Sequence, residues 1–330
     1  MINSLADGLL RIVVPDDAPA AVAGSAQEQK LREFGDLEIY DSLAAEPGEL
    51  LKRIGQADVA ICIRNSSQFS NEILSQCLKL KHIAVFGIGV DMVDLEACKR
   101  LGITVTNIPG YSAPAVAECA LTLALSVSRR VRQNDLLIRE GKWARDPVWQ
   151  LHGKTMGIIG AGPIGKRMAE LALAVGMNVI GWTFHPDLDW AQRVGVTWGT
   201  IEDVLSTSDV VSIHLRLSDQ SRGLVDEAKL ALMKPTSILV NTARGAIVDE
   251  DALLRALETG RIAGAGLDVF KTEPLPAGHA FTKLDNVLLS PHVAASTIET
   301  DYAGLEMVVD NIHNWMKGAP TNVVALAQAV

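Results

Sequence analysis

The sequence predicts an α/β protein with two open parallel sheets, and three observations support this prediction. Short strand-like and helix-like segments alternate over the first 107 residues. A glycine-rich turn at residues 160–165 stands between an apolar run and a helical segment. The same alternation then continues to about residue 315. Strands that alternate with helices form parallel sheets that are covered by helices.

The chain length of 330 residues allows two domains with separate cores. Hydrophobic residues make up 48% and charged residues 21%, as in ordinary globular proteins. The net charge of −9 argues against nucleic acid or an anionic membrane as a partner. An anion-binding site therefore has to be built locally, from a few arginines or backbone amides.

The cysteines and the apolar stretches bear on the location of the protein. The four cysteines are Cys62, Cys77, Cys98 and Cys119. They lie in apolar stretches without paired or metal-like spacing, which favours buried reduced thiols. The chain lacks a signal peptide at its start, and its most apolar long stretch, residues 113–127, is short and contains Glu118. We therefore expect a cytoplasmic protein with no membrane span and no metal.

The first third of the chain supplies the first sheet. We expect strands at residues 10–14, 37–40, 59–63, 82–86 and 103–107, and helices at residues 26–34, 47–55, 71–77 and 94–101. A parallel sheet binds its ligand at the carboxyl ends of its strands. Arg64 follows the third strand, and Gly87, Ile88 and Gly89 follow the fourth. For these glycines, a plain turn and free N–H groups that hold a carboxylate are both open.

A sharp break follows at Asn107-Ile108-Pro109-Gly110, because proline and glycine interrupt regular structure. Residues 115–140 then have the pattern of one long helix. The break is therefore a candidate hinge, or a simple linker, that leads into a second domain.

The second domain begins with a strand, a glycine turn, a helix and a second strand within residues 154–183. Gly160 permits the tight turn, Gly162 lets a pyrophosphate approach the backbone, and Gly165 lets the helix lie close to the strand. The helix that follows presents free N–H groups to the phosphates, and Pro163 and Ile164 of the turn are further candidates for cofactor binding. A bare GxGxxG also fits an ordinary loop, but this context favours a dinucleotide.

Three later strands end in residues that can do chemistry. We expect these strands at residues 237–241, 263–269 and 286–289, another strand at 209–213, and helices at 201–207, 227–232, 250–257 and 297–315. Arg244, Glu273 and His292 follow the three strands in turn. Each alone is typical of a surface charge or a packed histidine. Together, beyond a dinucleotide turn, they are the groups that hydride transfer requires.

The motifs together resemble the D-isomer-specific 2-hydroxyacid dehydrogenases, which include phosphoglycerate dehydrogenases and glyoxylate/hydroxypyruvate reductases. They are VFGIGVDMVD, NIPGYSAPAVAE, GIIGAGPIG, VNTARGAIVDEDAL, GLDVFKTEPLP and LSPHVAAST, in the order of the family. The resemblance implies two Rossmann-like domains with a cleft between them that closes on the substrate. Residues 1–107 and 292–330 would form a flavodoxin-like substrate-binding domain, and residues 108–291 the dinucleotide-binding domain.

The resemblance also implies a role for each matching residue in transfer of a hydride between a nicotinamide cofactor and a small 2-oxo or 2-hydroxy acid. His292 would be the general acid/base, because an imidazole can both give and take a proton near neutral pH. Glu273 would orient His292 and favour its protonated form. Arg244 would bind the substrate carboxylate with its planar fork.

The remaining implied contacts are shared between the two domains. The amides of Ile88 and Gly89 would hold the substrate carboxylate. Asp268 would contact the nicotinamide carboxamide, and Thr242 and Ala243 would line the nicotinamide pocket.

The sequence departs from the family pattern at the adenosine end. Thr183 ends the second strand of the cofactor domain, where members built for NAD usually carry an acidic residue that binds the ribose. Arg216 stands where the family commonly has proline, and it could neutralise a 2′-phosphate or point to solvent. NAD and NADP therefore both stay open, with a lean to NADP.

Three further alternatives stay open. Arg64 resembles an arginine near the substrate phosphate of phosphoglycerate dehydrogenases, and a surface arginine is the other interpretation. The long helix after Asn107 resembles the dimer-forming element of the family, which implies a homodimer. Trp143 and Trp149 either pack within their own chain or reach the neighbouring subunit. The fold also serves transcriptional corepressors, so an NAD(P)-sensing binding protein without turnover is the alternative function. The substrate side chain and the physiological direction are not specified by the sequence.

Overall fold

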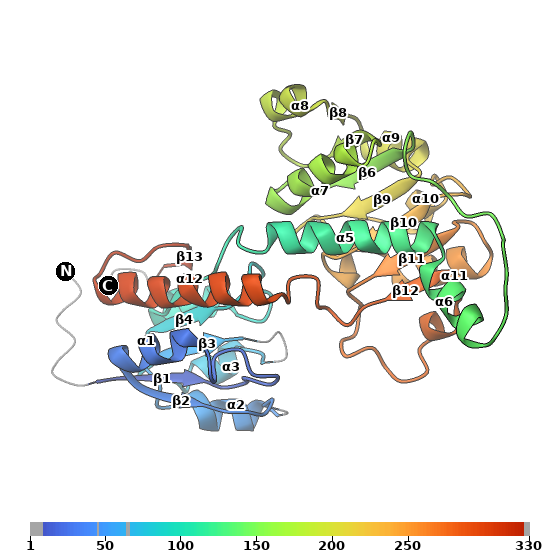
Figure 1. The fold of residues 1–330 in the computed structure, drawn as a ribbon. Coiled ribbons are helices and arrows are strands. Elements are labelled where there is room, and N and C mark those ends of the chain that lie inside the picture. Colours follow the sequence, from blue (N-terminus) through green and yellow to red (C-terminus); the bar gives the residue numbers. More distant parts are fainter. Residues whose placement is uncertain (1–8, 45, 64–66, 327–330) are drawn as a thin grey trace. The chain divides into compact units, whose positions relative to one another are not determined.

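The computed structural model describes residues 9–44, 46–63 and 67–326. The chain divides into two compact units (Figure 1). Unit 1 is Met1–Tyr111 with Thr297–Val330, and unit 2 is Ser112–Ser296. The domain boundaries that the sequence suggests, after residues 107 and 291, lie a few residues earlier in the chain.

Unit 1 contains a six-stranded sheet with the strand order β13-β5-β4-β3-β1-β2. Its strands are β1 (Leu10–Val14), β2 (Gly35–Ile39), β3 (Val59–Cys62), β4 (His82–Val85), β5 (Thr104–Thr106) and β13 (Val323–Ala325). The first five are parallel in the order of a flavodoxin-like sheet, as predicted. The antiparallel edge strand β13 was not expected, because its three residues belong to an apolar tail without alternation.

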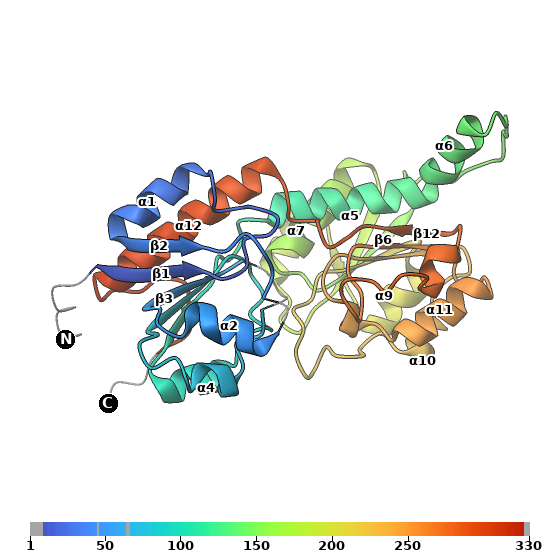
Figure 2. The ribbon, with the colours of Figure 1, turned by 90° about the horizontal axis from the view of Figure 1, so that it is seen from below.

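Helices cover both faces of this sheet. They are α1 (Ala26–Phe34), α2 (Pro47–Ile54), α3 (Asn71–Leu74), α4 (Leu95–Leu101) and α12 (Ile298–Met316). Figures 1 and 2 show α1 and α12 on one face, with α2 and α4 on the other. The strands alternate accordingly: Ile12 and Val14 pack in the cluster of α12, whereas Val13 packs in the cluster of α2.

Unit 2 contains a seven-stranded sheet with the order β12-β11-β10-β9-β6-β7-β8. The strands are β6 (Thr155–Ile159), β7 (Asn178–Trp182), β8 (Thr197–Trp198), β9 (Val210–Ile213), β10 (Ile238–Asn241), β11 (Gly264–Leu267) and β12 (Val287–Leu289). All neighbouring pairs are parallel. This is the Rossmann order, in which the direction of winding reverses between β6 and β9.

The helices of unit 2 also form two layers. They are α5 (Ala113–Ser128), α6 (Val131–Arg139), α7 (Pro163–Ala174), α8 (Leu188–Val194), α9 (Ile201–Thr207), α10 (Glu227–Leu230) and α11 (Glu250–Glu258), with the 3₁₀ turns η1 (Gly245–Ile247) and η2 (Ala280–Lys283). Met156 and Ile158 of β6 pack in the cluster of α5 and α7, and Ile159 packs in that of α9 and α11. Thus β6 is buried on both faces, as a central parallel strand requires.

The prediction of one helix over residues 115–140 is wrong. Arg130 has a left-handed φ of 50° and separates α5 from α6. The helix α5 packs on β10 and β11, whereas no residue from 129 to 150 is buried. Continued helix would bring no further burial there, so the break costs no packing. Figure 2 shows α6 projecting beyond the end of α5.

A buried histidine makes unit 1 sensitive to acid. His82 has no exposed surface, stacks on Trp315 at 5.0 Å between ring centroids, and places Nε2 2.9 Å from Oγ1 of Thr106. Burial lowers the pKa of His82 to about 3. As the pH falls below about 6.5, His82 is protonated in the unfolded chain but stays neutral in the folded chain. The free energy of unfolding therefore decreases.

Because of His82, we expect the free energy of unfolding to fall by roughly 2 kcal/mol between pH 7 and pH 5. Urea unfolding at the two pH values measures it. The variant His82→Gln should lose less stability over the same interval, because its amide does not titrate. An equal pH dependence in both proteins would contradict the assignment.

Candidate functional site

The glycine turn after β6 has the geometry that close approach of a phosphate requires. Gly160 has φ 96°, and a Cβ there would lie 2.8 Å from the amide nitrogen of Leu215. A Cβ on Gly165 would overlap the carbonyl oxygen of Gly160, so the helix can approach the strand only with glycine. A Cβ on Gly162 would meet nothing within 4 Å. The backbone at Gly162 is therefore open.

The first turn of α7 keeps its N–H groups available. Ser25, Asp94, Thr200 and Asp249 cap other helices with their side chains. By contrast, Gly162 is the N-cap of α7 without a side-chain cap, and Pro163 has no N–H to satisfy. Ile164 and Gly165 follow in the first turn, beside the reversal point between β6 and β9. Such a helix start favours an anion.

Two buried polar atoms at neighbouring strand ends have no hydrogen-bond partner among the described residues. They are Oγ1 of Thr242, after β10, and Nδ1 of His214, after β9. Although part of His214 reaches solvent, burial of its ring lowers its pKa to about 3, so the ring is neutral at pH 7. Buried polar atoms without partners are uncommon in proteins. With the open glycine turn, they fit a site that is completed by a dinucleotide.

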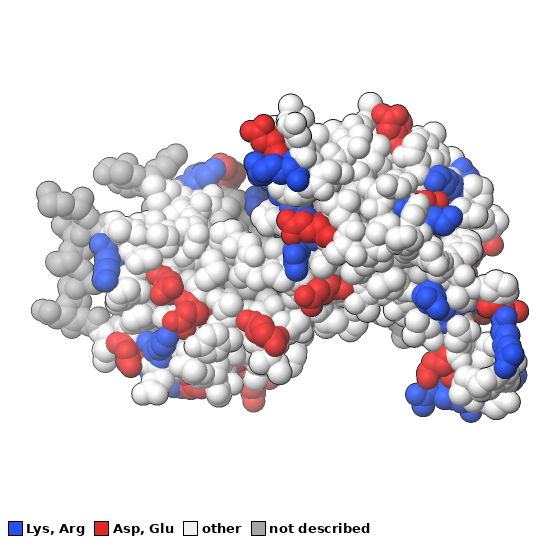
Figure 3. All heavy atoms as spheres, turned by 45° about the horizontal axis from the view of Figure 1, so that its top comes forward, with Lys and Arg blue, Asp and Glu red and all other residues white. Residues whose placement is uncertain are grey.

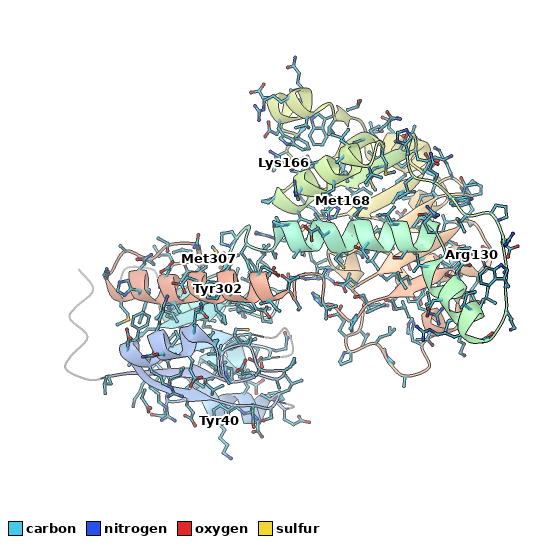
Figure 4. All side chains as sticks on the ribbon, in the orientation of Figure 1. Tyr40, Arg130, Lys166, Met168, Tyr302 and Met307 are labelled. Atoms are coloured by element: carbon cyan, nitrogen blue, oxygen red, sulfur yellow. The ribbon has the colours of Figure 1, made fainter. Side chains whose placement is uncertain are left out.

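At the predicted adenosine end of the site, neither residue that the sequence singled out is a carboxylate. Thr183 follows β7 and is partly exposed, and Arg216 is exposed after β9. The nearby Asp187 caps α8 and pairs with Lys166 at 2.5 Å. Figure 4 shows Lys166 on α7, and its Nζ lies 5.1 Å from the ring centroid of Trp190. Lys166 thus offsets the charge of Asp187.

The loop after β10 is fixed by its own strand end and by the next loop. The side chain of Asn241 donates to the carbonyl of Arg244 at 3.0 Å and accepts from the amide of Ala243 at 3.0 Å. A Cβ on Gly245 would overlap the carbonyl group of Phe270. The loops that hold Arg244 and Glu273 therefore touch at Gly245. Sequence reasoning missed Asn241 and Gly245 as supports, although a polar residue that ends a buried strand is a usable signal.

Glu273 and His292 form a direct pair. Nδ1 of His292 lies 2.7 Å from Oε2 of Glu273, and the amide of Phe270 donates to Oε1 at 2.9 Å. Partial burial alone would raise the pKa of the Glu273 carboxyl, but the bonds from His292 and Phe270, with the charge of Arg244, keep it below its usual value. Glu273 is then ionised and can only accept, so Nδ1 of His292 donates. Nε2 is left to exchange a proton.

Asp268 holds the backbone that carries His292. It is fully buried, and its two oxygens accept from the amides of Val293 at 3.0 Å and Ala294 at 2.9 Å. Its carbonyl accepts from the amide of His292 at 2.8 Å, and His292 has a left-handed φ of 55°. Asp268 thus stabilises a loop conformation that few non-glycine residues adopt. Its predicted contact with the nicotinamide stays a prediction.

The three other residues predicted to bind the substrate belong to unit 1. Ile88 and Gly89 follow β4 and are partly exposed. Arg64 lies outside the described residues. Within unit 2, the structure brings Arg244, Glu273 and His292 together.

The described residues contain no helix that is both long and apolar enough to cross a membrane. Over that same part of the chain, no three His, Cys, Asp or Glu side chains gather in a metal-binding group. On the face drawn in Figure 3, the coloured Lys and Arg side chains are interspersed with Asp and Glu. That face therefore offers no broad field of one sign among its described residues.

Comparison with known proteins identifies the family. Residues 121–294 match the D-isomer specific 2-hydroxyacid dehydrogenase, NAD binding domain. The chain is 40% identical to a glyoxylate reductase of Aeropyrum pernix over 305 residues, which are 89% of this chain and 91% of that protein.

Solved structures agree with this match. An acyclic imino acid reductase in complex with NADPH and D-Arg has a TM-score of 0.87 at 29% identity, over 96% of this chain and 100% of that one. A D-lactate dehydrogenase from Aquifex aeolicus, complexed with NAD and lactic acid, has a TM-score of 0.84 at 28% identity, over 95% and 98%. The match to the family domain over residues 121–294, the close relative and a shared two-unit fold show that this chain belongs to the D-isomer specific 2-hydroxyacid dehydrogenase family.

Proposed function

We propose that the chain is an NAD(P)-dependent D-2-hydroxyacid dehydrogenase that acts on small 2-oxo acids and their 2-hydroxy products. The observation that carries this proposal is the 2.7 Å pair between His292 and Glu273, beside the loop of Arg244. When bound, the nicotinamide cofactor supplies or accepts the hydride. His292 holds the proton that the carbonyl oxygen receives, and Arg244 binds the carboxylate in a fork geometry that a lysine lacks.

A substrate panel tests the proposal. Glyoxylate, hydroxypyruvate, pyruvate and phenylpyruvate are each assayed with NADH and with NADPH, and the chirality of any product is determined. We expect turnover of at least one 2-oxo acid to a D-2-hydroxy acid. Binding of the dinucleotide with no turnover of any of them would instead support the binding-protein alternative.

For the cofactor, we propose a preference for NADP. Support comes from the strand end at Thr183, which lacks a carboxylate, and from Asp187, whose charge is engaged by Lys166. Arg216 is exposed at the neighbouring strand end and is able to pair with a 2′-phosphate.

The variant Arg216→Leu should lower kcat/KM for NADPH about ten- to a hundredfold, as loss of a hydrogen bond to a charged group does. Its kcat/KM for NADH should change little, which makes NADH the internal control. A strong preference of the wild-type protein for NADH would refute the role of Arg216.

We also propose a homodimer in the cytoplasm. Support for the dimer comes from α6 and the segment after it, where Leu136, Ile138 and Trp143 expose apolar surface without a core of their own. Sedimentation equilibrium at micromolar concentration tests it, and a monomer would contradict it. The four cysteines, none of which is in a disulfide, favour a reducing compartment, which cell fractionation tests.

A further inference from the structure

The loop after β4 in unit 1 turns two carbonyls to one side. The carbonyl of Gly87 accepts from the amide of Ile108 at 3.1 Å. The carbonyl of Ile88 accepts from the side chain of Asn107 at 2.7 Å. A carbonyl oxygen can only accept, so the atom of Asn107 at this contact is its amide nitrogen.

The orientation of these carbonyls determines where two N–H groups point. In a trans peptide the C=O and the following N–H point in opposite directions. The N–H groups of Ile88 and Gly89 therefore face away from residues 107 and 108. Neither amide has a hydrogen-bond partner among the described residues. Two successive N–H groups that face the same way can both donate to one anion.

Asn107 is itself held rigidly. It is 6% exposed, its backbone N–H donates to the carbonyl of Asn322 at 3.1 Å, and its backbone carbonyl accepts from the side chain of Asn311 at 2.8 Å. Asn311 is 1% exposed and also accepts from the side chain of Asn322 at 2.9 Å. The peptide between Ile88 and Gly89, in contrast, ends in a glycine whose φ is little restricted. Without the bond from Asn107, this peptide is free to rotate.

We propose that Asn107 is a positioning residue that sets the peptide between Ile88 and Gly89 so that its N–H faces the substrate carboxylate. The inference rests on the proposed function, in which these amides hold that carboxylate. Asn107 does not touch the substrate and acts only through the peptide. Its effect is therefore on binding of the 2-oxo acid, and binding of the dinucleotide in unit 2 is unaffected.

Two variants of the full-length protein test the proposal. Asn107→Asp keeps the shape of the side chain but places an oxygen against the carbonyl of Ile88, and Asn107→Ser shortens it. We expect KM for the best 2-oxo acid of the panel to rise about tenfold or more in both, with a smaller change in kcat. The dinucleotide Kd, from quenching of tryptophan fluorescence, should stay within twofold.

A pH series separates positioning from a merely structural role. Protonation gives the carboxyl of Asn107→Asp an O–H that can donate to Ile88, so the ratio of its KM to that of the wild type should fall as the pH is lowered. Taking the ratio removes effects common to both proteins. The control Asn314→Asp introduces the same charge on α12, where the side chain of Asn314 donates to the hydroxyl of Thr321 and not to the loop after β4, and should leave KM unchanged.

If the variants fold poorly, a measurement on the wild-type protein can still refute the proposal. Titration with oxamate should shift the ¹⁵N–¹H resonance of Gly89, and an unmoved resonance would overturn the proposal. It would also be overturned by folded variants with unchanged KM, or by a melting temperature that falls without a change in KM. A wild-type protein that reduces no 2-oxo acid would instead refute the proposed function.

Discussion

Replacement of His292 by asparagine should lower kcat for the reduction of a 2-oxo acid by about two to four orders of magnitude, the usual contribution of a general acid. Asparagine keeps a polar side chain that can still meet Glu273 but has no proton to exchange near neutral pH. The loop conformation should survive, because asparagine tolerates the left-handed φ of 55° at this position. Steady-state kinetics, with KM for the dinucleotide as the control, measures the effect.

The variant Glu273→Gln tests the other half of the pair. Glutamine has one oxygen, so it can accept from Nδ1 of His292 or from the amide of Phe270 but not from both, and it carries no charge to stabilise the imidazolium. We expect a smaller loss of kcat than in His292→Asn, because the imidazole that carries the proton is still present. If His292→Asn turned over at the wild-type rate, the acid/base assignment would be wrong.

Replacement of Gly245 by alanine should separate Arg244 from Glu273. The added methyl would overlap the backbone carbonyl of Phe270 and lie 2.5 Å from the amide nitrogen of Lys271. Backbone cannot yield as a flexible side chain does, so the two loops must move apart. A displacement of about 1 Å at a catalytic site can cost a hundredfold in rate. We expect kcat/KM to fall by about that factor, with a loss of roughly 1–3 kcal/mol in stability.

The matched control is Gly48→Ala. A Cβ on Gly48 would meet nothing within 4 Å, and the residue lies in α2 of unit 1. Stability should rise slightly, because alanine favours a helix over glycine. Equal kinetics of Gly245→Ala and the wild type would show that the contact between the two loops is not needed to place Arg244.

The sequence predicts well what depends on local pattern. Buried parallel strands such as β6 and β10 are short apolar runs between turn residues, and the glycine turn is specified by its spacing. Elements that depend on tertiary contacts were not predictable. The break at Arg130 occurs where α5 leaves the sheet, and β13 is a strand only because β5 presents an open edge.

The same distinction applies to the candidate site. Arg244, Glu273 and His292 follow strands, so their chemistry marks them in the sequence. The residues that hold these groups in place are not marked in this way. Asn241, Gly245 and Asn107 act through hydrogen bonds and close contacts that no sequence spacing indicates. Asn107 in particular looks like part of a chain break until its partner Ile88 is known.

The exposed segment from residue 129 to residue 150 has an evolutionary consequence. None of its side chains is buried, so substitutions there leave both cores and the strand ends intact. If this segment forms the contact of the proposed homodimer, selection can alter that contact without altering the chemistry of the strand ends. Among homologues, we expect assembly and chemistry to diverge at different rates.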